Sequence, residues 1–277
     1  MTTTTVARAW SVSRADGLTL GFTDHDQRLV FGGVTFRPDR GLTARALVQG
    51  TGLSVDNSEA VGALNDDAIT ERDLMAGRWD QAELRMWEVD WSDVALRKLV
   101  FRGSLGEVSR ANGAFRAELR GLSEALNAPQ GRVYHPRCSA RLGDGACRVD
   151  LSAESLSVLR QVQVMDEGRV FTFTAFPAFD AAWFDHGRLE VLSGAAQGLH
   201  GAIKNDTARP GGQRIIELWS SLGILPATGD QIRLTAGCDK AADTCRLKFR
   251  NHLNFRGFPH LPSEDWVMAP QAGRRNG

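Results

Sequence analysis

Four cysteines are the residues of this chain best suited to chemistry, and they occur as two pairs. Cys138 and Cys147 lie in "HPRCSARLGDGACRVD", and Cys238 and Cys245 lie in "GCDKAADTCRLKFRNHLNFRGFP". Four separate buried cysteines would behave as small hydrophobic residues. Four thiolates around one centre would hold zinc or an iron–sulfur cluster. The short C-x₂₋₄-C spacing usual for zinc is absent, and clusters accept more varied spacing, so spacing alone leaves the metal undecided.

The composition excludes several classes of protein. The chain has 277 residues, and its 33 basic side chains balance its 33 acidic ones, which gives no support to bulk attraction to nucleic acid or membranes. No apolar run approaches the roughly 18 residues of a spanning helix. The segment "MTTTTVARAWSVSRADG" lacks the apolar core of a signal peptide. We therefore expect synthesis in the cytoplasm, no stable membrane insertion and no disulfide framework.

Short alternating segments and 29 glycines predict a mainly β protein with few short helices, built as two barrel or sandwich domains. The expected boundaries are 1–128 for the N-terminal domain, 129–262 for the C-terminal domain with the cysteines, and 263–277 for a tail. The N-terminal domain is expected to contain a meander at 17–38 and a helix at 65–77 that is capped by Asp66 or Asp67. It should continue with strands at 82–91 and 98–110, an Asn112-Gly113 hairpin and a short closing helix at 121–127.

Five further strands are predicted in the C-terminal domain, with the spacing of a small barrel. They are expected at 168–176, 187–194, 198–206, 213–220 and 230–237. The two cysteine pairs lie on either side of this block. The two ends of a barrel could therefore bring all four thiols together.

Enzyme motifs are weak in this chain. Asp24, His25 and Asp26 fall between two alternating segments, where polar residues are typical of a turn. His135 lies three residues before Cys138 in a proline-containing loop, which is poor support for an activated thiol. Asp185 and His186 are better interpreted as the entry to a strand. No phosphate-binding loop, nucleophile elbow or zinc-protease helix is present, and we expect no catalytic residues.

Several motifs carry a resemblance to a known family. These are "TDHD…L.F.G..F.P..G" near the N-terminus, then "HPRCSARLGDGAC" and "HGRLEVLSGAAQGL", and finally "AGCDK…TC…KF.N..NFRGFP". Together they resemble the tail-tip hub proteins of siphophage-like particles and bacterial gene transfer agents, related to the minor tail protein L of lambda-like phages. The resemblance covers nearly the whole chain.

The resemblance implies a structural, non-enzymatic hub of a phage-like tail. It implies a homotrimer of tail-tube-like β-domains, located in the virion at the tail tip, between the distal tail protein and the receptor-binding proteins. A tail-associated peptidase is a further implied partner, and DNA would only pass through the channel. It also implies an iron–sulfur cluster, expected as 4Fe-4S, on Cys138, Cys147, Cys238 and Cys245. Structural zinc in the same hub and an iron–sulfur redox or nucleic-acid-processing enzyme are the alternatives.

The residues around the cysteines fit a metal site. They also suit ordinary roles, with the basic residues on a solvated face and the aromatic residues in packing contacts. Lys240, Arg246, Lys248 and Arg250 could offset the charge of a thiolate-bound cluster. The aromatic residues of this stretch are expected to pack over the site or against a neighbouring subunit; they are Phe249, Phe255 and Phe258. Tryptophans are favoured at interface centres, so the candidate subunit contacts are Trp87, Trp91 and Trp266, with core packing favoured for Trp87.

Overall fold

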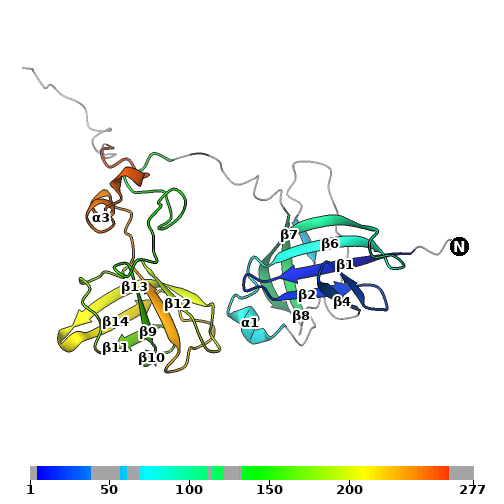
Figure 1. The fold of residues 1–277 in the computed structure, drawn as a ribbon, viewed down its shortest axis with the longest axis horizontal. Coiled ribbons are helices and arrows are strands. Elements are labelled where there is room, and N and C mark those ends of the chain that lie inside the picture. Colours follow the sequence, from blue (N-terminus) through cyan, green and yellow to red (C-terminus); the bar gives the residue numbers. More distant parts are fainter. Residues whose placement is uncertain are drawn as a thin grey trace, which may run out of the picture. The chain divides into compact units, whose positions relative to one another are not determined.

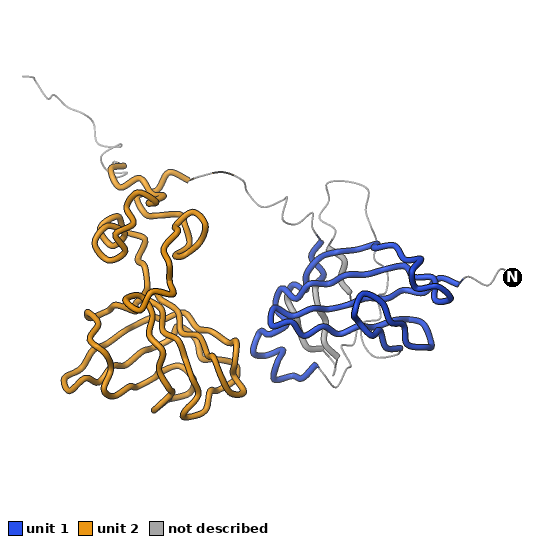
Figure 2. The backbone as a smooth tube through the Cα atoms, viewed as in Figure 1, with its two compact units in different colours: residues 1–130 blue, residues 131–277 orange. Residues whose placement is uncertain are grey.

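The structure is a computed structural model that describes residues 5–38, 57–60, 69–111, 114–121, 131 and 133–261. The chain divides into two compact units, residues 1–130 and 131–277 (Figure 2). Both units are mainly β, which confirms the fold class expected from the sequence. In the part of the chain that is described, no helix has the length and apolar character needed to cross a membrane.

The first unit contains one sheet of eight strands with the order β3-β4-β2-β1-β6-β7-β8-β5 (Figure 1). Its elements are β1 (Val6–Ser13), β2 (Thr19–Thr23), β3 (Leu29–Phe31), β4 (Val34–Pro38), β5 (Asn57–Ala60), α1 (Glu71–Met75), β6 (Glu83–Asp90), β7 (Arg97–Ala111) and β8 (Ala114–Gly121). Strand β1 is buried on both faces, because Trp10 and Val12 join one core cluster while Ala9 joins another. Ala111 lies opposite Ala114, as the hairpin prediction requires, although residues 112–113 are outside the described part.

The segment 17–38 forms the three expected strands but not a simple meander. Strand β4 lies between β2 and β3, pairing with β3 in antiparallel fashion and with β2 in parallel. Gly21 permits the parallel approach, because a Cβ at this position would lie 2.7 Å from the carbonyl oxygen of Thr35. The predicted Gly32-Gly33 turn is confirmed, since both residues have the positive φ that such tight turns require.

Helix α1 is shorter than predicted and has a different N-cap. The hydroxyl of Thr70 accepts a hydrogen bond from the backbone N–H of Asp73 at 3.1 Å, so Thr70 is the cap. The predicted caps, Asp66 and Asp67, lie outside the described residues. Gly77, with φ of 71°, follows the end of the helix as expected.

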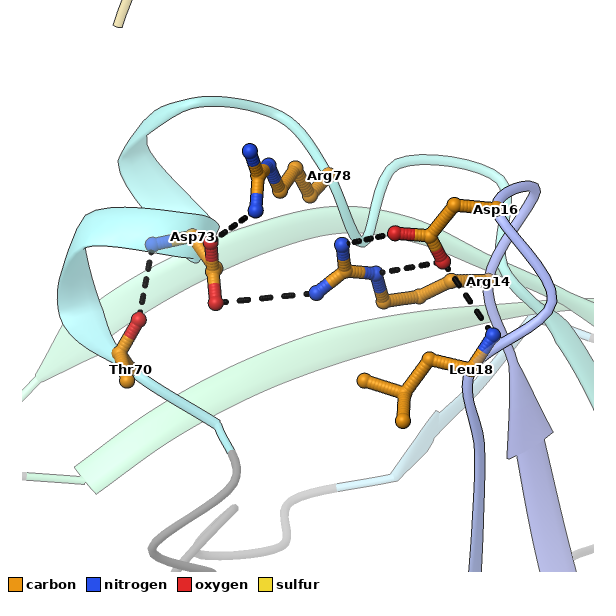
Figure 3. Close-up of polar contacts among 6 residues, drawn as sticks. All are labelled: Arg14, Asp16, Leu18, Thr70, Asp73 and Arg78. Atoms are coloured by element: carbon orange, nitrogen blue, oxygen red, sulfur yellow. Dashed lines mark hydrogen bonds and ion pairs between the residues drawn. The ribbon is translucent and has the colours of Figure 1, made fainter. Parts of the chain in front are cut away.

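Ion pairs fix α1 to the turn between β1 and β2 (Figure 3). The guanidinium of Arg14 contacts the carboxylates of Asp16 and Asp73, and the guanidinium of Arg78 donates to Asp73 at 3.1 Å. Arg14 is buried and also lies over the ring of Trp79, 5.2 Å from its centroid. These charge contacts, together with Leu74, which packs against the core cluster, hold a short helix that has no buried residue of its own.

The second unit contains seven antiparallel strands in the order β10-β11-β14-β13-β12-β15-β9. Its elements are β9 (Ser157–Gln161), β10 (Val164–Asp166), β11 (Val170–Phe173), β12 (Arg188–Val191), β13 (His200–Arg209), η1 (Pro210–Gly212), β14 (Gln213–Leu218), β15 (Gln231–Thr235), α3 (Ala242–Leu247) and η2 (His252–Asn254). All five strands expected here are present. Strands β9 and β10, which we did not predict, stand at opposite ends of the sheet order although only Val162 and Gln163 separate them. The short β9–β10 connection therefore joins the two edge strands of the sheet, as in a sheet that curls toward a barrel.

Candidate metal centre

The four cysteines lie in a lobe built from the two segments that flank the strands of the second unit. We call residues 133–155 and 238–261 the cysteine lobe. Because β9 and β15 pair with each other, the segment that enters β9 and the segment that leaves β15 run side by side (Figure 1). In Figure 2 the lobe stands apart from the strands of the same unit and is connected to them by these two passages. The topology thus joins cysteine pairs that are far apart in the sequence.

All four cysteines line one cavity. Cys138, Cys147, Cys238 and Cys245 share it with apolar residues and two polar ones; the other lining residues are Ala140, Leu142, Val149, Lys240, Ala241, Phe249 and Asn254. No disulfide joins the cysteines. Among the described residues, no three His, Cys, Asp or Glu side chains converge so as to hold a single metal ion. The four free thiols thus share one cavity.

Cys138 and Cys238 are held mainly through the backbone. The N–H of Cys138 donates to the carbonyl oxygen of Lys240 at 2.8 Å, which joins the two segments. The N–H groups of Lys240 and Arg256 donate to the sulfurs of Cys238 and Cys138, each at 3.4 Å. Lys240 has a φ of 67°, and this left-handed conformation accompanies the backbone contact with the sulfur of Cys238. Donors of this kind stabilise negative charge on sulfur.

Asp144 shapes the loop that presents Cys147. Its carboxylate accepts hydrogen bonds from the backbone N–H groups of Cys147 at 2.7 Å, Ala146 at 2.9 Å and Arg141 at 2.9 Å. These bonds, the one from Cys147 first, lower the pKa of Asp144. Its signal in the sequence is an aspartate between two glycines shortly before a cysteine, a pattern that is typical of a side-chain-capped turn.

Burial disfavours the thiolate forms of two cysteines when no metal is bound. Burial raises the pKa of Cys238, and the backbone N–H and the charge of Lys240 reduce this increase. Burial and the neighbouring thiols raise the pKa of Cys245 to about 11. At neutral pH these two groups are therefore thiols, and only a cationic group in the cavity would favour their deprotonation.

The basic residues near the cysteines have different surroundings. The ammonium of Lys240 donates to the carbonyl oxygen of Ala140 at 2.5 Å and thus bridges the two segments of the lobe. Lys248 reaches out of the lobe, donates to the carbonyl oxygens of Trp183 and Gly237, and lies 4.4 Å from the centroid of the Trp183 ring. Arg246 and Arg250 are exposed, so the solvated-surface interpretation holds for these two.

The aromatic residues proposed to cover the site or to contact a neighbouring subunit also have different surroundings. Phe249 lines the cavity, whereas Phe255 stacks on His252 and Phe258 contacts Tyr134. Trp87 packs edge-on against two phenylalanines of its own unit, consistent with a core role. Trp91 is 42% exposed, while Trp266 lies outside the described residues.

The weak enzyme candidates form turns, as expected. Asp24 accepts the backbone N–H of Arg8 at 2.6 Å, and the ring of His25 lies against Trp91. His135 accepts the backbone N–H of Arg137 at 3.0 Å instead of meeting a thiol. His186 lies just before β12, which fits the entry to a strand.

Comparisons with known proteins cover the whole chain. A family model described as "Baseplate hub protein, N-terminal attachment domain" matches residues 1–150, and one described as "Phage conserved hypothetical protein BR0599" matches residues 182–265. A chain in the structure "Virion of native gene transfer agent (GTA) particle" is 55% identical, with a TM-score of 0.89 over 100% of this chain and 95% of that one. No curated protein is significantly similar. The chain therefore belongs to the baseplate hub protein family, the hub components of phage and gene transfer agent tails.

Proposed function

We propose that this hub is a non-enzymatic homotrimer that joins the tail tube and distal tail protein to the tip proteins, and that an iron–sulfur cluster stabilises it. Cys138, Cys147, Cys238 and Cys245 would hold the cluster. The observation that carries the proposal is the single cavity that all four thiols line in a lobe formed by two distant segments.

The cysteine lobe has too little core to be stable through burial alone. Its buried apolar residues within the described part are only Ala140, Cys147 and Cys245. The strands of the same unit bury much larger side chains, such as Phe171, Phe173 and Ile216. Small structures without an adequate core depend on disulfides or metals, and the thiols here are free. When bound, a cluster would supply iron–thiolate bonds that cross-link the two segments of the lobe.

The number and spacing of the thiols favour a cluster over one zinc ion. Four thiols share the cavity, and the short C-x₂₋₄-C spacing usual for zinc is absent from both pairs. Backbone N–H groups donate to two of the sulfurs, and such bonds stabilise the negative charge of a thiolate. These features support iron–sulfur, expected as 4Fe-4S, over zinc.

The trimer is supported by the presence of two β units in each chain. A tail hub connects a sixfold tube to a threefold tip, and three chains with two units each would supply six β modules. A closed ring uses heterologous contacts, so each chain would present two different faces to its neighbours. DNA would then pass through the channel during delivery without a dedicated binding site.

The test of the cluster is anaerobic purification of the full chain, followed by visible absorption and analysis of iron and sulfide. We expect brown protein with iron and sulfide in comparable amounts, and loss of both in the Cys→Ser variants at the four positions. Colourless protein that holds one zinc ion would refute the iron–sulfur assignment and show a zinc site on the same four cysteines. Turnover of a redox dye or of DNA would favour the enzyme alternative.

The test of the hub is a reconstruction of assembled tails. Three copies around the axis between tube and tip are expected, and particles should fail to assemble without this chain. One copy, six copies or a location away from the tail would refute the trimer.

A further inference from the structure

We propose that Asn251 is the positioning residue for one side of the cysteine cavity, because among the described residues it alone connects Cys147 to Cys245. The inference rests on the proposed function, since it concerns how the same four thiols are held. Asn251 follows Arg250, whose φ of 49° turns the chain after α3, and this turn brings Asn251 back beside Cys245. Sequence reasoning did not single it out, although it is the first asparagine of the "N..N" spacing that follows the second cysteine pair.

The side chain of Asn251 fixes Cys147. Its amide nitrogen donates to the carbonyl oxygen of Cys147 at 2.5 Å and lies 3.7 Å from the sulfur of the same residue. The carbonyl oxygen of Cys147 can only accept, so the nitrogen of the amide must face it. Asn254 confirms this orientation, because its own amide nitrogen donates to the side-chain oxygen of Asn251 at 2.7 Å.

The backbone of Asn251 fixes Cys245, which lies in the same segment of the lobe. Its N–H donates to the carbonyl oxygen of Cys245 at 2.9 Å, and the thiol of Cys245 donates to the carbonyl oxygen of Asn251 at 3.3 Å. The other two cysteines are joined differently, through the backbone of Lys240 and without any asparagine. The link between Cys138 and Cys238 is therefore made by backbone, whereas the link between Cys147 and Cys245 runs through a single side-chain amide.

Only an amide of this length satisfies both partners of the side chain. An aspartate at this position keeps the shape but has no donor for the carbonyl oxygen of Cys147, and it adds a negative charge near the thiolates. An alanine removes the side-chain contacts with Cys147 while it leaves the backbone contacts with Cys245. Loss of the amide should therefore release Cys147 first. Partners that orient metal ligands typically change metal retention by about 10–100-fold.

The experiment compares N251D and N251A with the unchanged protein and with L253A. Leu253 lies in the same short turn and is 97% exposed, so it controls for changes in the turn itself. Each protein is purified anaerobically as the full chain and treated with N-ethylmaleimide, and mass spectrometry follows alkylation of each cysteine separately. Loss of visible absorption to an iron chelator is measured in parallel.

We expect Cys147 to be alkylated about 10-fold faster in N251D and N251A, Cys138 and Cys238 to stay within about twofold, and the chelator to act about 10-fold faster. L253A should match the unchanged protein. N254A, which removes the donor that orients the Asn251 amide, should act in the same direction with a smaller effect. Unchanged alkylation of Cys147, or equal acceleration at all four cysteines, would overturn the inference. If the unchanged protein holds no iron, the proposed cluster fails, and the alkylation pattern still decides the role of Asn251.

Discussion

Thr235 of β15 and Ser157 of β9 lie opposite each other at the end of an antiparallel ladder. Beyond this pair the two strands leave the sheet as neighbours, and the backbone bond from the N–H of Ala236 to the carbonyl oxygen of Leu156 continues their contact. The cysteine pairs follow on these two segments. Proximity of the four thiols is therefore a consequence of strand pairing, which brings the two cysteine-bearing segments together beyond the sheet.

Removal of the proposed cluster should loosen the cysteine lobe and leave the strands intact. The lobe buries few apolar residues, whereas the strands keep their own core with or without a metal. Hydrogen exchange of the loaded and chelator-treated protein is the measurement. We expect much faster exchange in residues 133–155 and 238–261 and unchanged exchange in β11, β13 and β14. Equal protection of the lobe in both states would show that it needs no metal.

Gly237, at the passage from β15 into the lobe, should not tolerate a side chain. A Cβ at this position would lie 1.7 Å from the carbonyl oxygen of Asp185 and 2.4 Å from the nitrogen of Gly187. G237A should therefore displace the segment and lower the yield of folded protein or its iron content. G145A is the matched control, since Gly145 lies in the other cysteine loop with open space around it and no positive φ. Equal behaviour of the two variants would contradict the close packing at this passage.

Much of the strand pattern was visible in the sequence, because alternation of apolar side chains reports burial of one sheet face. Strand β14 is a clear case, with burial that alternates at every residue. Strands β9 and β10 were missed because none of their residues is buried, so neither shows the alternation of a buried face. Alternation identifies a strand but not its neighbours, so the parallel pairing of β4 with β2 was not predictable.

The candidate site was predictable only in part. The cysteines stand out by type, and their placement around a barrel-like block suggested that they meet. The groups that hold them were less visible, since Asn251 and Asp144 act through contacts made across a turn or across the lobe. An asparagine in a loop has many ordinary roles, and its partner Cys147 lies 104 residues away in sequence.

The buried ion pair between Arg214 and Asp206 should be essential to the second unit. Its side chains are 3% and 0% exposed, and Asp206 also accepts the backbone N–H of Phe184 at 2.9 Å. Arg214 donates further to the carbonyl oxygens of Phe179 and Asp180, which holds this loop on the sheet. Removal of one partner from such a pair costs about 3–5 kcal/mol, because the other charge stays buried without compensation.

The measurement for this pair is the opening free energy of β13 and β14 from hydrogen exchange of the full chain. D206A and R214A should each lose about 3–5 kcal/mol. The double variant D206L/R214M should lose less than either, since no charge is left unpaired. A double variant as unstable as the sum of the two singles would show that the residues act independently.

Asp16 should make the first unit sensitive to acid. Burial opposes ionisation of this carboxyl, but hydrogen bonds from Arg14 and from the N–H of Leu18, with the charges of Arg14 and Arg78, lower its pKa below the ordinary 3.8 (Figure 3). A carboxyl whose pKa is lower in the folded state contributes stability above its unfolded-state pKa and loses it as the pH falls through the folded value.

D16N, which resembles the protonated form, should therefore be less stable than the unchanged protein at neutral pH. The difference should shrink as the pH falls below 3.8 and through the lower folded-state pKa. Hydrogen exchange of β1 and β2 across this range measures it, and D26N is the control because the side chain of Asp26 is 85% exposed. A difference that stays constant with pH would show that the carboxylate of Asp16 does not stabilise the contact between α1 and the β1–β2 turn through its charge.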